Sequence, residues 1–172
     1  MRVAGSGRER ENPGMPTTPE HLRDLMFRFG RGPLLVREAI SGLDAGALNR
    51  RPVGSDWSIR DIIIHLADAE IVGAMRLRLV IANDAPAIEP WEEGPWKRRL
   101  HYLWRDPEAA LALFELLVYT NGELLQQCDA QSWKRTGVHP ERGVITLEDL
   151  LQDRVTHSEE HIAQIREYRE GR

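Results

Sequence analysis

The chain has 172 residues, 41% of them hydrophobic, which suits one compact domain with a single core. Its formal net charge is −4 at pH 7, and acidic and basic residues are interspersed along the whole length, so no basic face is expected to bind nucleic acid. No apolar run approaches the roughly 18 residues that a membrane span needs, so no membrane partner is expected either.

The cysteine content and the N-terminal segment point to an intracellular protein. A single cysteine, Cys128, excludes an intrachain disulfide and suits a reducing compartment. Residues 1–16 lack the apolar stretch of a signal peptide and are rich in glycine, proline and charge. We therefore expect a mobile tail over residues 1–16 and one helical domain over residues 17–172 of a cytoplasmic protein.

The first helical pattern begins after residue 16. Thr17 or Thr18 is suited to cap it, and Pro19 falls in the first turn, where its missing N–H is harmless. The sequence GRGP at residues 30–33 predicts that this helix is broken or split. Residues 41–56 carry enough glycine, proline and aspartate to be a connection with at most one turn of helix.

A second helix is predicted from Ser58, which can form a capping box with Asp61. It continues to about residue 83 with an apolar stripe wide enough to face a bundle interior. Residues 84–99 contain three prolines and two tryptophans, and they predict an ordered excursion over the bundle that ends in a short helix through residues 99–104.

The third and fourth helices have clear starts. Asp106 can cap the third helix with Pro107 at its first position, and Thr146 can cap the fourth with Asp149 three positions on. Residues 130–143 are expected to form the loop between them. The sequence therefore predicts an all-α protein, a four-helix bundle with an irregular excursion between the second and third main helices.

Two histidines in the fourth helix are candidate metal ligands. His157 and His161 are four residues apart, so both side chains project from one helix face, close enough to bind one ion. The alternative is a solvated polar face, because such pairs also occur by chance. His65, among four large aliphatic residues on the second helix, could be a third ligand or a buried histidine that donates to a backbone carbonyl.

Paired motifs in the second and fourth helices resemble the DinB/YfiT-like superfamily of four-helix bundles. The similar features are a Trp-Ser helix start with His65 seven residues after the serine, a Gly-x-x-Thr-Leu entry to the fourth helix, and a closing His-x-x-x-His followed by Gln164. The resemblance spans roughly residues 20–168. It implies that His65, His157 and His161 bind one divalent metal ion, Zn, Ni or Fe.

The same resemblance implies a chemistry. Three protein ligands leave an open position, which is typical of a working site rather than a structural one. Characterised relatives include enzymes that use low-molecular-weight thiols, so a metal-dependent thiol S-transferase acting on a small-molecule thiol and an electrophilic substrate is the leading hypothesis, and a homodimer is expected. A metal-dependent hydrolase, a non-catalytic metal-binding or stress-response bundle, and a bundle with merely structural histidines remain alternatives.

Four further residues are candidates for substrate binding. Trp91 and Trp96 in the excursion could cover the mouth of a pocket or contact a dimer partner. His139 precedes the fourth helix and could reach the site, although loop histidines are usually exposed. Asn121 could contact substrate if its helix face is internal.

Two charged residues interrupt the apolar pattern of the second helix. We interpret Glu70 and Arg76 as a surface ion pair in preference to a substrate clamp.

Overall fold

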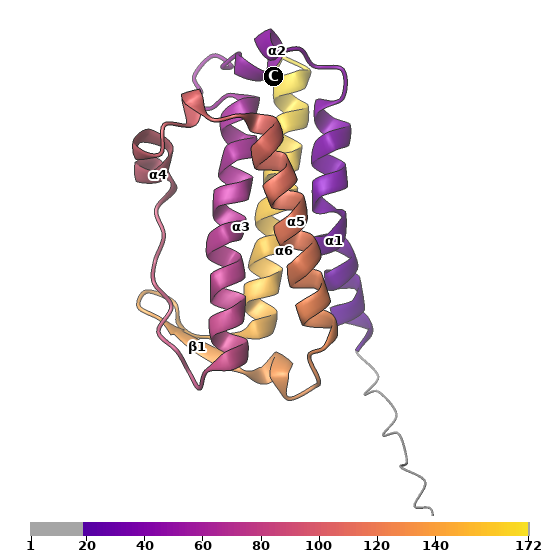
Figure 1. Cartoon of the computed structure of the whole chain (residues 1–172), viewed down its shortest axis with the longest axis vertical. Helices are drawn as coiled ribbons and strands as arrows, with labels where there is room; N and C mark the ends of the chain where they lie inside the picture. The colour runs from indigo at the N-terminus through magenta and orange to yellow at the C-terminus, as the bar shows by residue number, and fades with distance from the viewer. Residues whose placement is uncertain (1–18, 172) are drawn as a thin grey trace, which may run out of the picture.

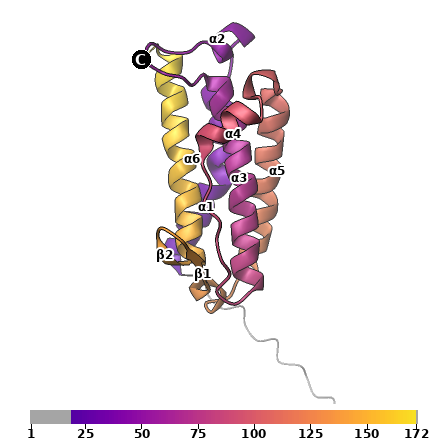
Figure 2. The ribbon, with the colours of Figure 1, turned by 90° about the vertical axis from the view of Figure 1, so that its left-hand side faces the viewer.

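Four long helices form a bundle in the structure, a computed structural model that describes residues 19–171, and the first and fourth of them run in one direction while the second and third run in the other (Figures 1 and 2). They are α1 (Glu20–Ile40), α3 (Ile59–Ala82), α5 (Pro107–Gln126) and α6 (Leu147–Arg169). Helix α3 packs against α5 and α6, and α1 packs against the same two helices. The predicted all-α four-helix bundle is confirmed. The predicted tail over residues 1–16 and the predicted caps Thr17 and Thr18 lie outside the described range.

Short elements connect the long helices. They are α2 (Ala45–Asn49), α4 (Glu93–Arg99), the 3-10 turns η1 (Tyr102–Trp104) and η2 (Ser132–Lys134), and the strands β1 (Thr136–His139) and β2 (Gly143–Thr146). The excursion between α3 and α5 is confirmed, and its helical part begins earlier than predicted, at α4. Within residues 19–171, no helix is both long enough and apolar enough to cross a membrane.

The core fills the space between the four long helices. Its buried side chains come from three different helices and include Ile62, Leu66, Phe114, Leu151 and Val155. The apolar stripe predicted for the second helix does face the bundle interior, through Ile62 and Leu66 of α3.

Helix α1 is continuous, so the predicted break at residues 30–33 is wrong. Pro33 lies inside the helix and removes one backbone hydrogen bond. Pro33 is nevertheless buried together with Phe29 and Val36, and a Cβ on Gly32 would lie 3.7 Å from the Phe114 ring. Close packing of this face against α5 and α6 holds the helix together through the proline.

The predicted helix starts are confirmed at α3, α5 and α6. Ser58 Oγ accepts from Asp61 N at 3.1 Å while the Asp61 carboxylate accepts from Ser58 N at 3.1 Å. Thr146 and Asp149 repeat this capping box at α6. Asp106 accepts from the Glu108 amide at 2.9 Å with Pro107 at the first position of α5.

Removing the α3 cap is expected to destabilise the fold. Ser58→Ala deletes the acceptor for the Asp61 amide at a site that is only 3% exposed, so we expect a loss of about 1 kcal/mol in the free energy of unfolding, measured by urea denaturation. Ser41→Ala is the matched control, because Ser41 is exposed and caps the end of α1 through its backbone alone. Equal losses in the two variants would contradict the role of Ser58.

A β-hairpin occupies the predicted loop between α5 and α6. Strand β1 pairs antiparallel with β2, with Val138 opposite Val144. The hairpin also ties down the start of the excursion, because Ile88 N donates to Val138 O and Val138 N donates to Pro86 O, both at 2.9 Å. From this end of the bundle, opposite α2, the excursion runs along the outside of α3 to α4 (Figures 1 and 2).

Candidate metal centre

Three histidines from two helices converge on one point. His65 projects from α3, and His157 and His161 project from α6, which packs against it. One potential ligand atom from each lies within 4.8 Å of the other two. The three ring centroids form a nearly equilateral triangle with sides of 4.6, 4.7 and 4.9 Å. The spacing of four residues within α6 and the packing of α6 on α3 together produce this triangle.

The geometry fits a small divalent ion. Two nitrogen ligands at about 2.0–2.1 Å from a tetrahedral zinc ion lie roughly 3.4 Å apart. His65 Nε2 and His157 Nε2 are 2.9 Å apart, so a small outward shift of either ring would accommodate an ion between them. Imidazole nitrogen is also a good ligand for nickel and ferrous iron, so the donor set is compatible with each of the three metals predicted from the sequence.

Burial keeps two of these imidazoles neutral. Desolvation lowers the pKa of His65 to about 3, and the neighbouring charges of His161 and Arg154 act in the same direction. Desolvation likewise lowers the pKa of His157 to about 2, again with help from Arg154. Neutral imidazole is the form that binds metal, so at neutral pH both rings are in the binding form without having to lose a proton.

A hydrogen-bonded chain orients His161. Its Nδ1 lies 2.9 Å from Gln164 Oε1, Gln164 Nε2 donates to Tyr168 OH at 2.8 Å, and that hydroxyl lies 2.7 Å from Ser55 Oγ. An amide oxygen can only accept, so His161 Nδ1 carries the proton and Nε2 keeps its lone pair for a metal. Gln164 thereby fixes the tautomer that ligation requires.

Tryptophans enclose the histidines. Trp91 stacks on His65 with ring centroids 5.3 Å apart, and Trp57 meets the same ring edge-on at 5.1 Å. Together with the two α6 histidines they leave His65 fully buried. The sequence indicated Trp57 only as part of the entry to the helix, because it lies eight residues before His65 and the contact between the two rings is visible only in the structure.

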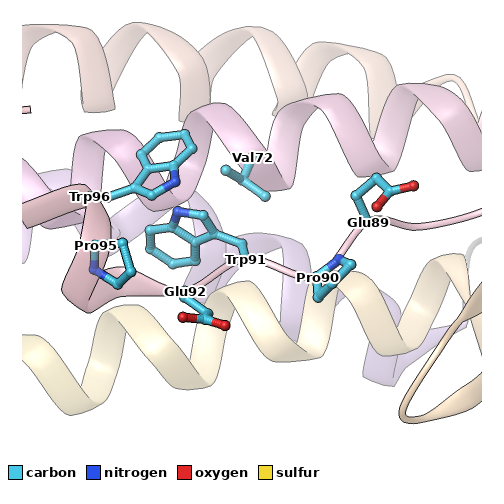
Figure 3. Close-up of a pocket in the computed structure, with 7 residues that line it drawn as sticks. All are labelled: Val72, Glu89, Pro90, Trp91, Glu92, Pro95 and Trp96. Atoms are coloured by element: carbon cyan, nitrogen blue, oxygen red, sulfur yellow. The ribbon is translucent and has the colours of Figure 1, made fainter. Parts of the chain in front are cut away.

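A pocket of about 410 Å³ lies beside this centre, between the excursion and α3 (Figure 3). Its walls are Val72, Glu89, Pro90, Trp91, Glu92, Pro95 and Trp96. The Trp91 and Trp96 rings meet edge to face at 5.5 Å. Trp91 contacts both the pocket and His65, so it links the apolar pocket to the histidine triangle.

The other two candidates for substrate binding have different surroundings. Asn121 is fully buried, and it donates to Glu70 and accepts from Arg78. His139 lies on β1, and its Nδ1 accepts from the Glu141 amide in the adjacent turn. Neither residue lines the pocket beside the histidines, and their roles in substrate binding stay predictions.

Glu70 and Arg76 do not form the predicted surface pair. Glu70 is 2% exposed and accepts from Asn121 Nδ2 at 2.8 Å. Burial raises its pKa to about 7, opposed by the charges of Arg154 and Arg78 and by the Asn121 hydrogen bond. Arg76 instead donates to the Glu89 carbonyl. The error arose because a charged residue among apolar ones looks identical in sequence whether it is solvated or enclosed by partners from other helices.

Arg154 of α6 lies against α3, where its charge acts on Glu70 and on two of the histidines. It donates to the Ala69 carbonyl at 3.0 Å, and a Cβ built on Gly73 would lie only 2.4 Å from its Cδ. Burial lowers its pKa. The positive charge that it places near His65 and His157 was not predicted from the sequence, in which Arg154 looks like an ordinary surface residue.

Glu93, the first residue of α4, also reaches the centre. Its Oε2 lies 3.6 Å from His65 Nε2, and its side chain is 55% exposed. Lys97, one turn later, lies over the Trp57 ring at 4.4 Å and holds α4 against the start of α3. Glu93 was not predicted as a site residue, because only the course of the excursion, which the sequence does not reveal, brings it to α3.

Comparison with known proteins places the same histidine-bearing segment in a described family. A model of the DinB superfamily matches residues 28–165. The "Putative metal-dependent hydrolase YfiT" of Bacillus subtilis is 32% identical over 136 residues, covering 78% of this chain and 76% of the relative. The "Putative metal-dependent hydrolase OB0782" of Oceanobacillus iheyensis is 29% identical over 133 residues, covering 77% of each chain.

Solved structures show the same fold. The structure of Bacillus subtilis YfiT, described as a probable metal-dependent hydrolase with an unusual four-helix bundle topology, matches with a TM-score of 0.81 at 28% identity over 95% of this chain and 92% of that one. A mycothiol-dependent maleylpyruvate isomerase matches with a TM-score of 0.67 at 14% identity, over 87% of this chain and 63% of that one. The second likeness concerns the fold alone.

Proposed function

This chain belongs to the DinB superfamily, and on that premise we propose that it binds one divalent metal ion through His65, His157 and His161 and acts as a thiol S-transferase. The observation that carries the proposal is the convergence of three imidazoles, two of them kept neutral by burial, beside an aromatic pocket. A divalent ion supplies Lewis-acid chemistry in such a site and lowers the pKa of a water or thiol in an open coordination position.

The chain's own residues would position the electrophile. Trp91 and Trp96 offer flat apolar surfaces that exclude water, and Trp91 Nε1 is buried without a hydrogen-bond partner among the described residues. That N–H is therefore free to donate to an acceptor on a substrate. The only cysteine, Cys128, bonds back to the Leu124 carbonyl, and burial raises its pKa, so the attacking sulfur has to come from a cosubstrate.

A low-molecular-weight thiol is the cosubstrate class that the family resemblance implies, and a protein of the same fold is named for its dependence on mycothiol. In the transfer, the thiol sulfur forms a bond to the electrophilic carbon, the leaving group departs with the electron pair of its bond, and the thiol proton passes to solvent. The protein provides no covalent nucleophile in this scheme.

A metal-dependent hydrolase is the second candidate. The curated relatives carry that name, and in a hydrolase water replaces the thiol as nucleophile. The two functions differ in one requirement, because only the transferase needs an added thiol. Non-catalytic metal binding is the third outcome of the same assay.

Metal-loaded protein is expected to accelerate the reaction of a low-molecular-weight thiol with an aryl halide. We expect a saturable rate at least about 100-fold above the uncatalysed one, because the site both orients the electrophile and favours the thiolate. Release of the thioether product, followed by absorbance, measures it, and chelated protein is the control. Thiol-independent hydrolysis of an activated ester would favour the hydrolase, and inactivity in both assays would contradict an enzymatic role.

A pair of tryptophan variants tests the pocket in the same assay. Trp91→Ala is expected to raise KM for the electrophile about tenfold while the protein keeps its metal, because one aromatic wall is lost. Trp104→Ala is the matched control, since Trp104 is 84% exposed and does not line this pocket. Equal KM values in the two variants would indicate that the electrophile binds outside this pocket.

The homodimer and the cytoplasmic location stay predictions. The exposed apolar side chains Phe27, Leu34, Leu116 and Tyr119 on α1 and α5 support a dimer surface. Sedimentation of a monomer at micromolar concentration would contradict it.

A further inference from the structure

We propose that Glu93 is a fourth, displaceable protein ligand of the metal centre, an inference that rests on the function proposed above. The residue comes from the excursion, the chain segment between α3 and α5, and lies at the first position of α4. Its Oε2 is 3.6 Å from His65 Nε2. Within residues 19–171, no other carboxylate oxygen lies within 4 Å of a ring nitrogen of these three histidines.

The distance suits a shared ion better than an ion pair. At 3.6 Å the two atoms are too far apart for a direct hydrogen bond. Two ligand atoms at about 2.0–2.2 Å from one tetrahedral ion lie roughly 3.4 Å apart, close to the observed separation. Glu93 is outside the set of atoms within 4.8 Å of one another, so ligation requires its flexible side chain to turn towards His157 and His161.

The excursion is held in a position from which the Glu93 side chain needs only a small rotation to reach the other two histidines. Trp91, two residues earlier, stacks on His65. Lys97, one turn later, donates to the Asp56 carbonyl and lies 3.4 Å from the Asp61 carboxylate at the start of α3. Contacts on both sides of Glu93 therefore fix its backbone beside the histidines, and only its own side chain has to move.

Charge provides an independent argument. Imidazole ligands bring no negative charge, so three histidines leave both positive charges of a divalent ion uncompensated, and Arg154 adds a further positive charge near His65 and His157. A doubly charged ion in a partly buried site is stabilised by an anionic ligand. Glu93 is the carboxylate best placed to supply that charge.

The exposure of Glu93 explains why the ligand would be displaceable. Its side chain is 55% exposed, whereas His65 is fully buried, so the carboxylate can turn out to solvent without disturbing the core. Its departure would open one position to a cosubstrate thiol. With all four ligands in place the centre resembles a closed site, and without Glu93 it resembles an open one.

Zinc affinity tests the inference with a matched pair of variants. The dissociation constant of wild-type protein is measured by competition with a chromophoric chelator, alongside Glu93→Gln and Glu92→Gln. We expect Glu93→Gln to bind zinc about 10- to 100-fold more weakly, because it loses an anionic ligand, and Glu92→Gln to bind like wild type. Glu92 is the neighbouring carboxylate, lies in the pocket wall and forms no described contact with a histidine.

The visible absorption of cobalt-loaded protein is the second measurement, because it reports ligand number and geometry directly. Glu93→Gln is expected to change the spectrum, and Glu92→Gln is not. Unchanged affinity and an unchanged spectrum in Glu93→Gln would overturn the inference while leaving the three-histidine centre intact. Wild-type protein that binds neither zinc nor cobalt would overturn the proposed function itself, so the two failures are distinguishable.

Discussion

Replacing His161 with alanine is expected to reduce bound metal from about one ion per chain to nearly none. His161 and His157 are neighbours on α6, and only with His65 do they make a three-nitrogen site. The variant keeps only two of the three histidines. It also removes the imidazole to which the hydrogen bonds through Gln164 and Tyr168 lead. Elemental analysis of protein without a histidine tag, after reconstitution with zinc, nickel or ferrous iron, measures the loss.

His139→Ala is the control for this experiment. It removes a histidine that lies on β1, outside the converging set, so its metal content should match that of wild type. Far-UV circular dichroism of both variants checks that the bundle still folds. A His161→Ala protein that keeps its full metal content would contradict the centre, as would wild-type protein that takes up none.

The second large effect concerns Glu70 and pH. Burial raises the folded-state pKa of this carboxyl from 4.5 to about 7. Below about pH 4.5 it is protonated in both states. As pH rises, the unfolded chain ionises first, and the folded state loses relative stability until its own pKa is passed near pH 7. The shift corresponds to a loss of about 3 kcal/mol in the free energy of unfolding.

Glu70→Gln isolates this contribution. Glutamine keeps an oxygen to accept from Asn121 and cannot ionise beneath Arg154 and Arg78. Between pH 5 and pH 8, we expect the free energy of unfolding of the variant to increase relative to that of wild type by up to about 3 kcal/mol. Urea denaturation of metal-free protein measures this difference. If the difference in free energy of unfolding between the two proteins stayed constant across this range, the raised pKa of Glu70 would be contradicted.

The buried histidines make the opposite contribution. The folded-state pKa values of His65 and His157 are lowered to about 3 and about 2, so these residues add stability as pH rises from there to the ordinary value of 6.5. Both are present in wild type and in Glu70→Gln. Their effect therefore cancels in the difference between the two proteins.

Local signals in the sequence predicted the frame of this molecule. The capping boxes at Ser58 and Thr146 depend on residues three positions apart, and the structure shows both. The spacing of His157 and His161 is equally local. His65 required the resemblance to a family, because nothing within α3 reveals that its ring faces α6.

Features that depend on long-range packing could not be predicted. The continuity of α1 through Pro33 depends on the neighbouring helices, and the burial of Glu70 depends on Asn121, which is 51 residues away in sequence. Glu93 reaches His65 only because the excursion is tied to the hairpin at one end and to the start of α3 at the other. Helix propensity and hydrophobic periodicity are local properties of the sequence, so they do not predict contacts between distant segments.

The position of Arg154 against α3 explains why a residue that by itself weakens this helix occurs in it. Glycine inside a helix costs about 1 kcal/mol relative to alanine, yet Gly73 lies in the middle of α3. A methyl group there would occupy the place of the Arg154 side chain. The absence of a side chain at Gly73 therefore makes room for Arg154, and a Gly73→Ala substitution would raise the helix propensity of α3 only by displacing the Arg154 side chain from its present position.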